Sequence, residues 1–330
     1  MKKTLSMAIL FTLGFLLMGG MIQAQDKKYV AKLGLIMPPD HPNNRTWVYL
    51  SEKVKEKTGG KLEIQVFHSG QLGQQKDLFL GTQMGTIQMA MIPFTIAAAW
   101  VPESKIFDLP YLFMAREEMW RVFRSPVGKK FFNEIYPKAG LVGIMWTDDG
   151  SRSFYGHKPV RRPSDLKGLK IRVPASEIMI QSINALGAIG TPTAWAEVYL
   201  ALQQKVIDGA ENSPLSFYNS KHWEVCKVYS ITEHFWLPCP LLVNKKFWEG
   251  LPPEIHTQVQ EAVVDAEQYG IKIYGEEENK VMGWLKEKGV QVITDVDKEA
   301  LQKQVQPVYD AYVKQHGTEL LNQIRAARKR

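Results

Sequence analysis

Strand-like and helix-like hydrophobic patterns alternate along the first third of this 330-residue chain. Residues 29–38, 61–67 and 87–94 are short apolar or alternating segments, which are typical of strands. Residues 44–60 carry apolar side chains at helical spacing and end in two glycines, and residues 68–85 form a glycine turn that leads into a second helix. Strands that alternate with helices predict an α/β unit with a largely parallel sheet.

The same alternation restarts near residue 150 and predicts a second α/β unit. Its expected elements are an extended segment at 151–156, a turn at 163–168 with Ser164 as N-cap, strands at 169–173, 188–193 and 206–212, and helices at 176–186 and 194–204. Residues 252–289 have the pattern of one very long helix, broken or kinked near Gly270 or Gly275. Such a helix is long enough to bridge two domains, and the chain is long enough to form them.

One strand of the second unit holds an arginine in a rigid place. Leu169, Ile171 and Val173 share one face of this strand, Arg172 lies on the other face, and Pro174 ends the strand. Because ligands of α/β sheets bind beyond the carboxyl ends of strands, an arginine at this position is a candidate ligand contact. For any single arginine, a surface salt bridge is the alternative.

Two more polar groups stand at strand ends of the same unit. Arg152 begins the extended segment at 151–156, and Asn212 ends the strand at 206–212. A planar guanidinium binds a carboxylate through two parallel hydrogen bonds, so two fixed arginines and an amide favour a carboxylate site. Trp195, at the start of a helix, either stacks on a ligand ring or packs in the core.

The N-terminus predicts a secretory signal peptide over residues 1–25, cleaved near Ala24 or Gln25. Two lysines, an apolar run and small residues follow in that order. The alternative is an uncleaved anchor, since the run approaches the ~20 residues that span a bilayer, but its glycines and polar end favour cleavage. Cleavage lowers the formal net charge from +7 to +5 (7 − 2), and no basic run is long enough to predict a nucleic-acid partner.

The chain lacks the signals of an enzyme or a metal protein. No GxSxG, GxGxxG, Walker or HExxH motif occurs, and the seven histidines are scattered. We therefore expect no catalytic residue, no cofactor and no metal. Cys226 and Cys239 are the only cysteines, too few for a structural zinc site. In an exported chain they either form a disulfide or remain two buried thiols, and both alternatives stay open.

Several segments share one family resemblance in the same chain order. They are GLKIRVP (168–174), TPTAWAEVYLALQQKVIDGAENSP (191–214), GGKLEIQVFHSGQLGQQKDL (59–78), FDLPYLF (107–113) and WEVCKVYSITEHFWLPCPLLVNKKFWEGLPPE (223–254). Together they resemble the solute-binding receptors of tripartite ATP-independent periplasmic (TRAP) transporters, the DctP-type dicarboxylate-binding-protein family. The sequence departs from the family pattern at Ala210, where glutamine is usual, and at Ser213, which separates the asparagine from Pro214.

The resemblance implies an α/β, two-lobed periplasmic-binding-protein fold with a ligand cleft between the lobes and a long helix spanning both. Lobe I is expected over residues 26–149 plus 238–277, and lobe II over residues 150–237 plus 278–330. The residues that match ligand-binding positions of the family are Arg172 (the carboxylate-binding arginine), Arg152 (a second arginine), Asn212 (an amide), Trp195 (an aromatic platform), Gln75, His234 and Trp236. Pro93 falls where some members carry a polar ligand contact.

The implied function is that of a receptor rather than an enzyme. The protein is expected in the periplasm as a monomer that binds an organic acid and delivers it to the small and large membrane permease subunits. Two tryptophans and several polar cleft residues favour a sugar acid such as a uronate. A small hydroxy or keto acid, or an aromatic acid, is the alternative ligand. A periplasmic enzyme and a sensory receptor on the same scaffold are the alternative classes.

Overall fold

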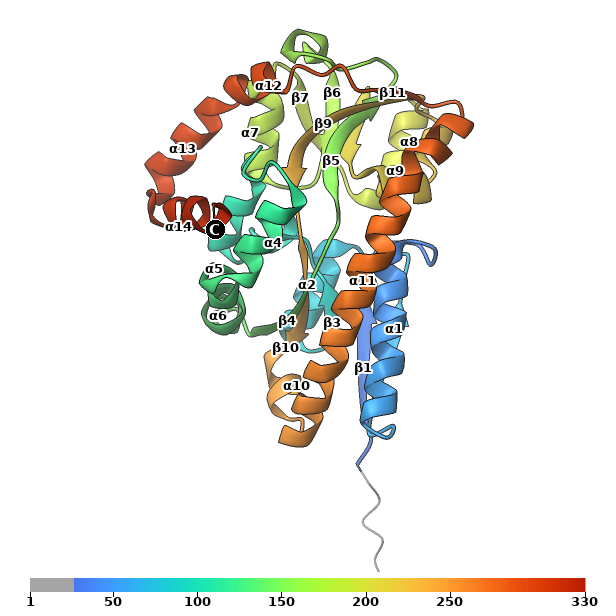
Figure 1. Ribbon diagram of the computed structural model, residues 1–330, viewed down its shortest axis with the longest axis vertical. Coiled ribbons are helices and arrows are strands. Elements are labelled where there is room, and N and C mark those ends of the chain that lie inside the picture. Colours follow the sequence, from blue (N-terminus) through green and yellow to red (C-terminus); the bar gives the residue numbers. More distant parts are fainter. Residues whose placement is uncertain (1–26, 330) are drawn as a thin grey trace, which may run out of the picture.

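Two β-sheets organise residues 27–329, the part of the chain that the computed structural model describes (Figure 1). The predicted signal peptide lies outside the described residues. The first sheet has the order β2-β1-β3-β10-β4, with strands β1 (Tyr29–Gly34), β2 (Leu62–Phe67), β3 (Met89–Met91), β4 (Leu141–Thr147) and β10 (Cys239–Asn244). The second has the order β11-β9-β5-β8-β6-β7, with strands β5 (Ser151–Gly156), β6 (Lys170–Val173), β7 (Ile189–Pro192), β8 (Gly209–Asn212), β9 (Val228–Trp236) and β11 (Gln291–Ile293).

Helices cover both sheets and confirm the predicted α/β class. Those before β5 are α1 (Pro42–Lys57), α2 (Gln75–Met84), α3 (Phe94–Ala97), η1 (Pro102–Asp108), α4 (Arg116–Arg124), α5 (Pro126–Lys130), η2 (Phe131–Ile135) and α6 (Tyr136–Lys138). Those between β5 and β9 are η3 (Pro163–Leu166), α7 (Glu177–Ala185), η4 (Trp195–Glu197), α8 (Val198–Gln203), α9 (Pro214–Asn219) and η5 (His222–Glu224). The later helices are α10 (Lys245–Glu249), α11 (Pro253–Glu287), α12 (Lys298–Gln304), α13 (Gln306–His316) and α14 (Glu319–Arg328).

The sheets are less parallel than the sequence pattern predicts. Strand β10 is antiparallel to both neighbours, and so is β5, while the remaining pairs are parallel. The reason is topological: β5 and β10 are the strands by which the chain enters one lobe from the other, so they run away from the boundary between the lobes. All other strands run toward this boundary, which brings their carboxyl ends together where ligands bind in α/β folds.

The chain passes between the two sheets three times. It crosses from β4 to β5, returns from β9 to β10, and crosses again along α11, which Figure 1 shows as a long helix beside both lobes. The apolar face of α11 packs into the first lobe near its start and into the second lobe near its end. The long helix is thus confirmed, and a break is wrong because α11 is continuous, while a kink stays a prediction. Gly270 instead permits close contact with α1, because a Cβ atom there would lie 2.9 Å from Thr46.

Two other details of the sequence analysis need correction. The N-cap of η3 is Arg162 rather than Ser164, and the carboxylate of Asp165 accepts hydrogen bonds from backbone N–H groups that precede the helix. Cys226 and Cys239 are both free, and they lie in the separate hydrophobic cores of the second and first lobes. The disulfide alternative is therefore wrong for this structure. Burial raises the pKa of the Cys226 thiol to about 12.

The lobe boundaries at residues 149, 237 and 277 stay a prediction. The last helix, α14, packs against α4 and α5 of the first lobe, although the predicted boundary assigns it to the second.

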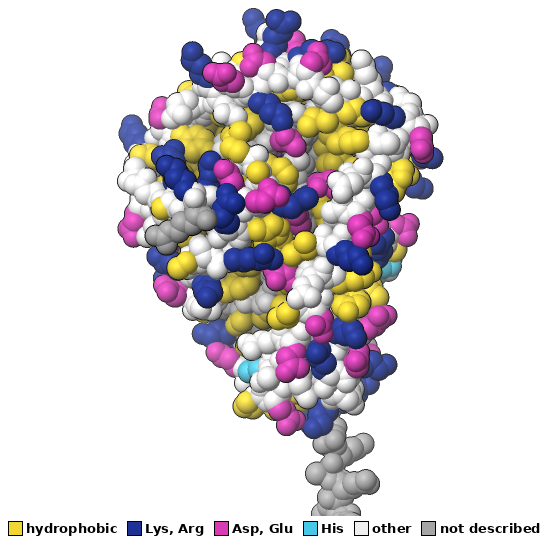
Figure 2. Space-filling model, viewed as in Figure 1, with side chains coloured by type: hydrophobic (Ala, Val, Ile, Leu, Met, Phe, Trp, Pro, Cys, Tyr) yellow, Lys and Arg dark blue, Asp and Glu magenta, His cyan; other side chains and the backbone are white. Residues whose placement is uncertain are grey.

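Positive and negative side chains are interspersed on the face drawn in Figure 2. The described residues contain no helix that is both long enough and apolar enough to cross a bilayer.

Candidate ligand-binding site

Arg172 lies on the side of the second sheet that faces the boundary between the lobes, and it forms no ion pair with any residue of the described part of the chain. Strand β6 is held between β7 and β8, so the backbone of Arg172 is fixed on both sides. Its side chain is only 2% exposed, and its Nε donates a hydrogen bond to the carbonyl oxygen of Thr193 at 2.9 Å. No ion pair joins Arg172 to a carboxylate within residues 27–329. Burial lowers the pKa of this guanidinium to about 10, although the carboxylate of Glu211 opposes the shift, so the free site destabilises the charge that it holds.

A cavity of about 250 Å³ brings Arg172 together with residues of the first lobe. Its walls are Gln74, Gln75, Lys76 and Ile96 on one side, and Arg172, Pro174, Ala175, Pro192, Thr193, Ala194 and Trp195 on the other. Three predicted site residues, Gln75, Arg172 and Trp195, therefore share one cavity between the lobes. The guanidinium carbon of Arg172 lies 5.3 Å from the ring centre of Trp195, which is a cation–π contact.

Arg152 is also buried, but its donors are already engaged. Its Nε and Nη2 atoms donate to the two carboxylate oxygens of Glu211 at 2.6 and 2.7 Å, and Nη1 donates to Asn212 Oδ1 at 3.0 Å. The structure thus brings Arg152 and Asn212 together in one network, in which Glu211 balances the charge of Arg152. Arg172 is left as the cation that a ligand carboxylate can balance.

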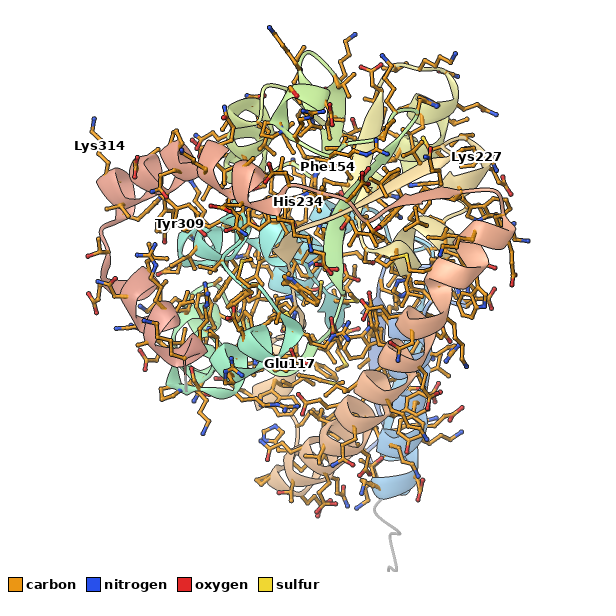
Figure 3. All side chains as sticks on the ribbon, turned by 45° about the horizontal axis from the view of Figure 1, so that its top comes forward. Glu117, Phe154, Lys227, His234, Tyr309 and Lys314 are labelled. Atoms are coloured by element: carbon orange, nitrogen blue, oxygen red, sulfur yellow. The ribbon has the colours of Figure 1, made fainter. Side chains whose placement is uncertain are left out.

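His234 borders this network on its far side. Its Nε2 lies 3.7 Å from a carboxylate oxygen of Glu211, and its Nδ1 lies 2.8 Å from Thr232 Oγ1. The imidazole stacks on Phe154 with ring centres 4.2 Å apart, inside the molecule (Figure 3). Burial lowers the pKa of His234, although Glu211 opposes that shift. The His234 imidazole is therefore a neutral, buried neighbour of the Arg152 network. It does not line the cavity that holds Arg172.

Trp236 is the predicted site residue that stands at the crossing between the lobes, where it pairs with Ser151 beside Arg152. It ends β9 at the crossing between the lobes, where its ring faces Arg116 at 5.6 Å. Like Arg152, Asn212 and His234, it is absent from the walls of the cavity that holds Arg172.

Direct contacts between the lobes flank the cavity. Ser176 Oγ donates to Asp108 Oδ2 at 2.6 Å, and Lys105 forms an ion pair with Glu177 at 3.1 Å. Burial raises the pKa of Asp108 to about 7. Sequence reasoning missed Asp108 and Glu211. One available signal was that Glu211 falls within a strand predicted to be buried, where a carboxylate needs a partner.

His222 provides a test of how the site controls charge. Its ring lies 4.8 Å from that of Trp195, and its Nδ1 is 2.8 Å from the hydroxyl of Tyr155. Burial, followed by repulsion from Arg172, lowers the pKa of His222 to about 3. The imidazole is therefore neutral beside the cavity at physiological pH.

We expect His222 to destabilise the protein as the pH falls from about 6.5 to about 3. In this range the unfolded chain binds a proton on His222 that the folded protein excludes, which costs up to about 1.4 kcal/mol per pH unit. In His222→Gln the free energy of unfolding should therefore change less with pH than in the wild type. Urea unfolding of both proteins at pH 7, 6 and 5 measures this. The same change of unfolding free energy with pH in both proteins would contradict a lowered pKa of His222.

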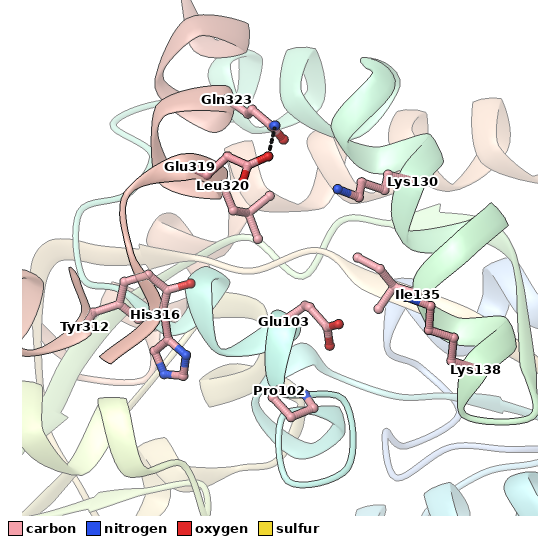
Figure 4. Close-up of a pocket in the computed structure, with 10 residues that line it drawn as sticks. All are labelled: Pro102, Glu103, Lys130, Ile135, Lys138, Tyr312, His316, Glu319, Leu320 and Gln323. Carbon is pink, nitrogen blue, oxygen red and sulfur yellow. Dashed lines mark hydrogen bonds between the residues drawn. The ribbon is translucent and has the colours of Figure 1, made fainter. Parts of the chain in front are cut away.

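A second surface cavity, of about 310 Å³, lies between the C-terminal helices and the first lobe (Figure 4). Lys130 and Lys138 line one wall, and Glu103, Glu319 and other residues line the rest. It contains none of the predicted site residues.

No cluster of His, Cys, Asp and Glu suited to a metal ion occurs within residues 27–329. The chemistry of the Arg172 cavity, a buried cation beside an aromatic ring and amides, fits binding of a small anion.

The chain is similar to known solute-binding proteins in sequence and in fold. The sequence profile of the bacterial extracellular solute-binding protein, family 7, matches residues 33–316. A TRAP periplasmic solute-binding protein of Chromohalobacter salexigens, solved with bound D-glucuronate, is 33% identical with a TM-score of 0.87, covering 91% of this chain and 99% of that one. One from a Sulfitobacter species, with bound β-D-galacturonate, is 32% identical with a TM-score of 0.87 over 90% and 99% of the chains. One from Sulfurospirillum deleyianum, with bound succinate, is 27% identical with a TM-score of 0.86 over 91% and 99%.

Proposed function

The chain belongs to the bacterial extracellular solute-binding proteins of family 7 and is a solute receptor of a TRAP transporter, and from this we propose that its ligand is a sugar acid bound through its carboxylate. One observation carries the proposal: Arg172 is buried, has no ion-pair partner among residues 27–329, and faces a cavity walled by both lobes. A ligand carboxylate restores the missing balance of charge through two parallel hydrogen bonds.

The remaining walls of the cavity support a ligand larger than a simple diacid. Trp195 offers an apolar face to a sugar ring, while Gln75 and Lys76 supply polar groups from the opposite lobe. Two related receptors hold uronates, which supports a uronate as the first candidate. A third related receptor holds succinate, so a small acid is the second candidate.

The remaining properties of the receptor are inferred from its family. Family members are receptors that bind small organic acids and work with membrane permease components. We infer that this chain is exported through the leader at residues 1–25, acts as a monomer in the periplasm, and hands its ligand to the two permease subunits. It performs no covalent chemistry on the ligand in this proposal.

A thermal-shift screen tests the ligand class. A ligand that binds only the folded protein stabilises it by about 2.7 kcal/mol at a hundred times its dissociation constant. We expect D-glucuronate or D-galacturonate to raise the melting temperature of the wild type, and to raise that of Arg172→Ala much less. A shift with neutral sugars and none with sugar acids would contradict the proposal.

Two further variants separate the roles of the cavity walls. Trp195→Ala should weaken uronates more than succinate, because it removes the ring surface but leaves Arg172 in place. Gln75→Ala should preserve the requirement for a carboxylate but reduce the selectivity among acids, because Gln75 contacts a different part of the ligand. Calorimetry with both acids on each variant measures this. If Gln75→Ala bound the amides of these acids as well as the acids themselves, the anion site would be misplaced.

A further inference from the structure

Arg116, the first residue of α4, lies outside the ligand cavity and binds two acidic residues. Its Nε lies 2.5 Å from Asp148 Oδ2, and its Nη2 donates to Glu278 Oε2. Its guanidinium carbon is 5.6 Å from the ring centre of Trp236 and 5.8 Å from that of Tyr274. We call these five residues the Arg116 cluster.

The four partners of Arg116 are distributed over the three connections between the lobes. Asp148 lies in the crossing from β4 to β5, Trp236 ends β9 just before the return to β10, and Tyr274 and Glu278 lie on α11. One side chain of the first lobe therefore contacts all three segments by which the chain passes between the two sheets. In Figure 1 the crossing strands run between α4 and α11.

The charges of this cluster tolerate little displacement. Asp148 is 5% exposed, and its second carboxylate oxygen accepts a hydrogen bond from the backbone N–H of Gly150 at 2.8 Å. Burial raises the pKa of both Asp148 and Glu278, and Arg116 opposes the shift. A buried carboxylate that loses its cation is strongly destabilised, so a rotation that separates Arg116 from either acid is unfavourable.

We propose that Arg116 is a positioning residue that fixes the angle between the lobes, and through it the ligand affinity. It touches no wall of the Arg172 cavity. It acts by holding the three connections in one arrangement, the arrangement in which Gln75 and Arg172 face the same cavity. Without it, the lobes sample a wider range of angles and the cavity is complete for less of the time.

The distance between the lobes tests the proposal without any ligand. Cysteines at two exposed positions, Lys55 on α1 and Lys167 before β6, accept spin labels, while the native thiols are buried. We expect Arg116→Met to broaden the distance distribution between the labels. Arg124→Met, on the same helix but with a mostly exposed side chain, should leave it unchanged. Because no ligand is present, this result does not depend on the proposed function.

The affinity readout rests on the proposed function. We expect Arg116→Met to weaken D-glucuronate binding by a factor of about ten to a hundred, and Arg116→Lys to restore part of the loss because it keeps the charge. If Arg116→Met does not fold, Glu278→Gln removes one charge of the cluster at nearly constant volume and should broaden the distances to a smaller extent. A lower melting temperature with unchanged distances and affinity would make Arg116 a purely structural residue and overturn the proposal. Unchanged distances in Glu278→Gln, with Arg116→Met unfolded, would also overturn it.

Discussion

Replacing Arg172 with alanine is expected to weaken binding of a carboxylate ligand by a factor of tens to thousands. Removing one partner of a desolvated charge pair commonly costs ~2–5 kcal/mol, because the other charge then stays buried and unpaired. Arg172 is nearly inaccessible to water, so it meets this condition. Arg172→Lys should recover only part of the affinity, since an ammonium group lacks the two parallel donors of a guanidinium. Isothermal titration of both variants measures the two losses.

A substitution at Lys170 provides the matched control for Arg172. Lys170 lies two residues earlier on β6, but its side chain is exposed. Lys170→Ala changes the net charge of the protein by the same amount as Arg172→Ala, so it reports any general electrostatic effect. Equal losses in the two alanine variants, or wild-type affinity in Arg172→Ala, would remove Arg172 from the binding site.

Replacing Glu211 with alanine should have the largest effect on stability. Glu211 is completely buried and is the carboxylate partner of Arg152. Breaking a buried ion pair from one side typically costs ~3–5 kcal/mol, because the remaining charge has no compensation. Urea unfolding should therefore show a much lower free energy of unfolding for Glu211→Ala, with Glu211→Gln between it and the wild type, since an amide still accepts a hydrogen bond.

An exposed arginine–carboxylate pair gives the comparison for Glu211. Arg161 and Asp295 form an ion pair at 2.9 Å, but the Asp295 side chain is 70% exposed. Solvent screens such pairs, so Asp295→Ala should change the free energy of unfolding very little. A loss at Glu211 no greater than that at Asp295 would show that burial of the Arg152 network adds nothing to stability.

Local patterns predicted much of this fold, because its strands and helices follow from hydrophobic spacing within single segments. The strand that holds Arg172 and the helix α11 are examples, since each has a regular hydrophobic pattern with clear end signals in the sequence. The direction of β5 and β10 was not predictable in this way. It depends on which lobe the chain enters next, which is a property of the whole topology. Gly270 was misread for the same reason, since its contact with Thr46 joins two distant helices.

The candidate site shows the same difference between local sequence features and contacts that join distant residues. Arg172 and Trp195 became candidates because a strand end and a helix start are local features, and Gln75 became one through the family resemblance; the structure places all three at one cavity. The contacts of Glu211 and Arg116 were not predictable, because their partners lie far away in the sequence and only the tertiary structure brings them together. Trp236 fell at a family position of the cleft, yet its ring faces Arg116 at the crossing strands. A sequence position alone does not specify the direction of a side chain.

Titration of the wild-type protein with D-glucuronate and with D-glucuronamide is the most direct test of a carboxylate site at Arg172. The two compounds have almost the same size and hydroxyl groups, and they differ in whether the terminal group carries a charge. The proposed site predicts measurable heat and saturable binding with the acid, and affinity at least tens of times weaker with the amide. Equal affinity for both compounds would contradict it, because the cavity would then recognise the sugar and not the carboxylate.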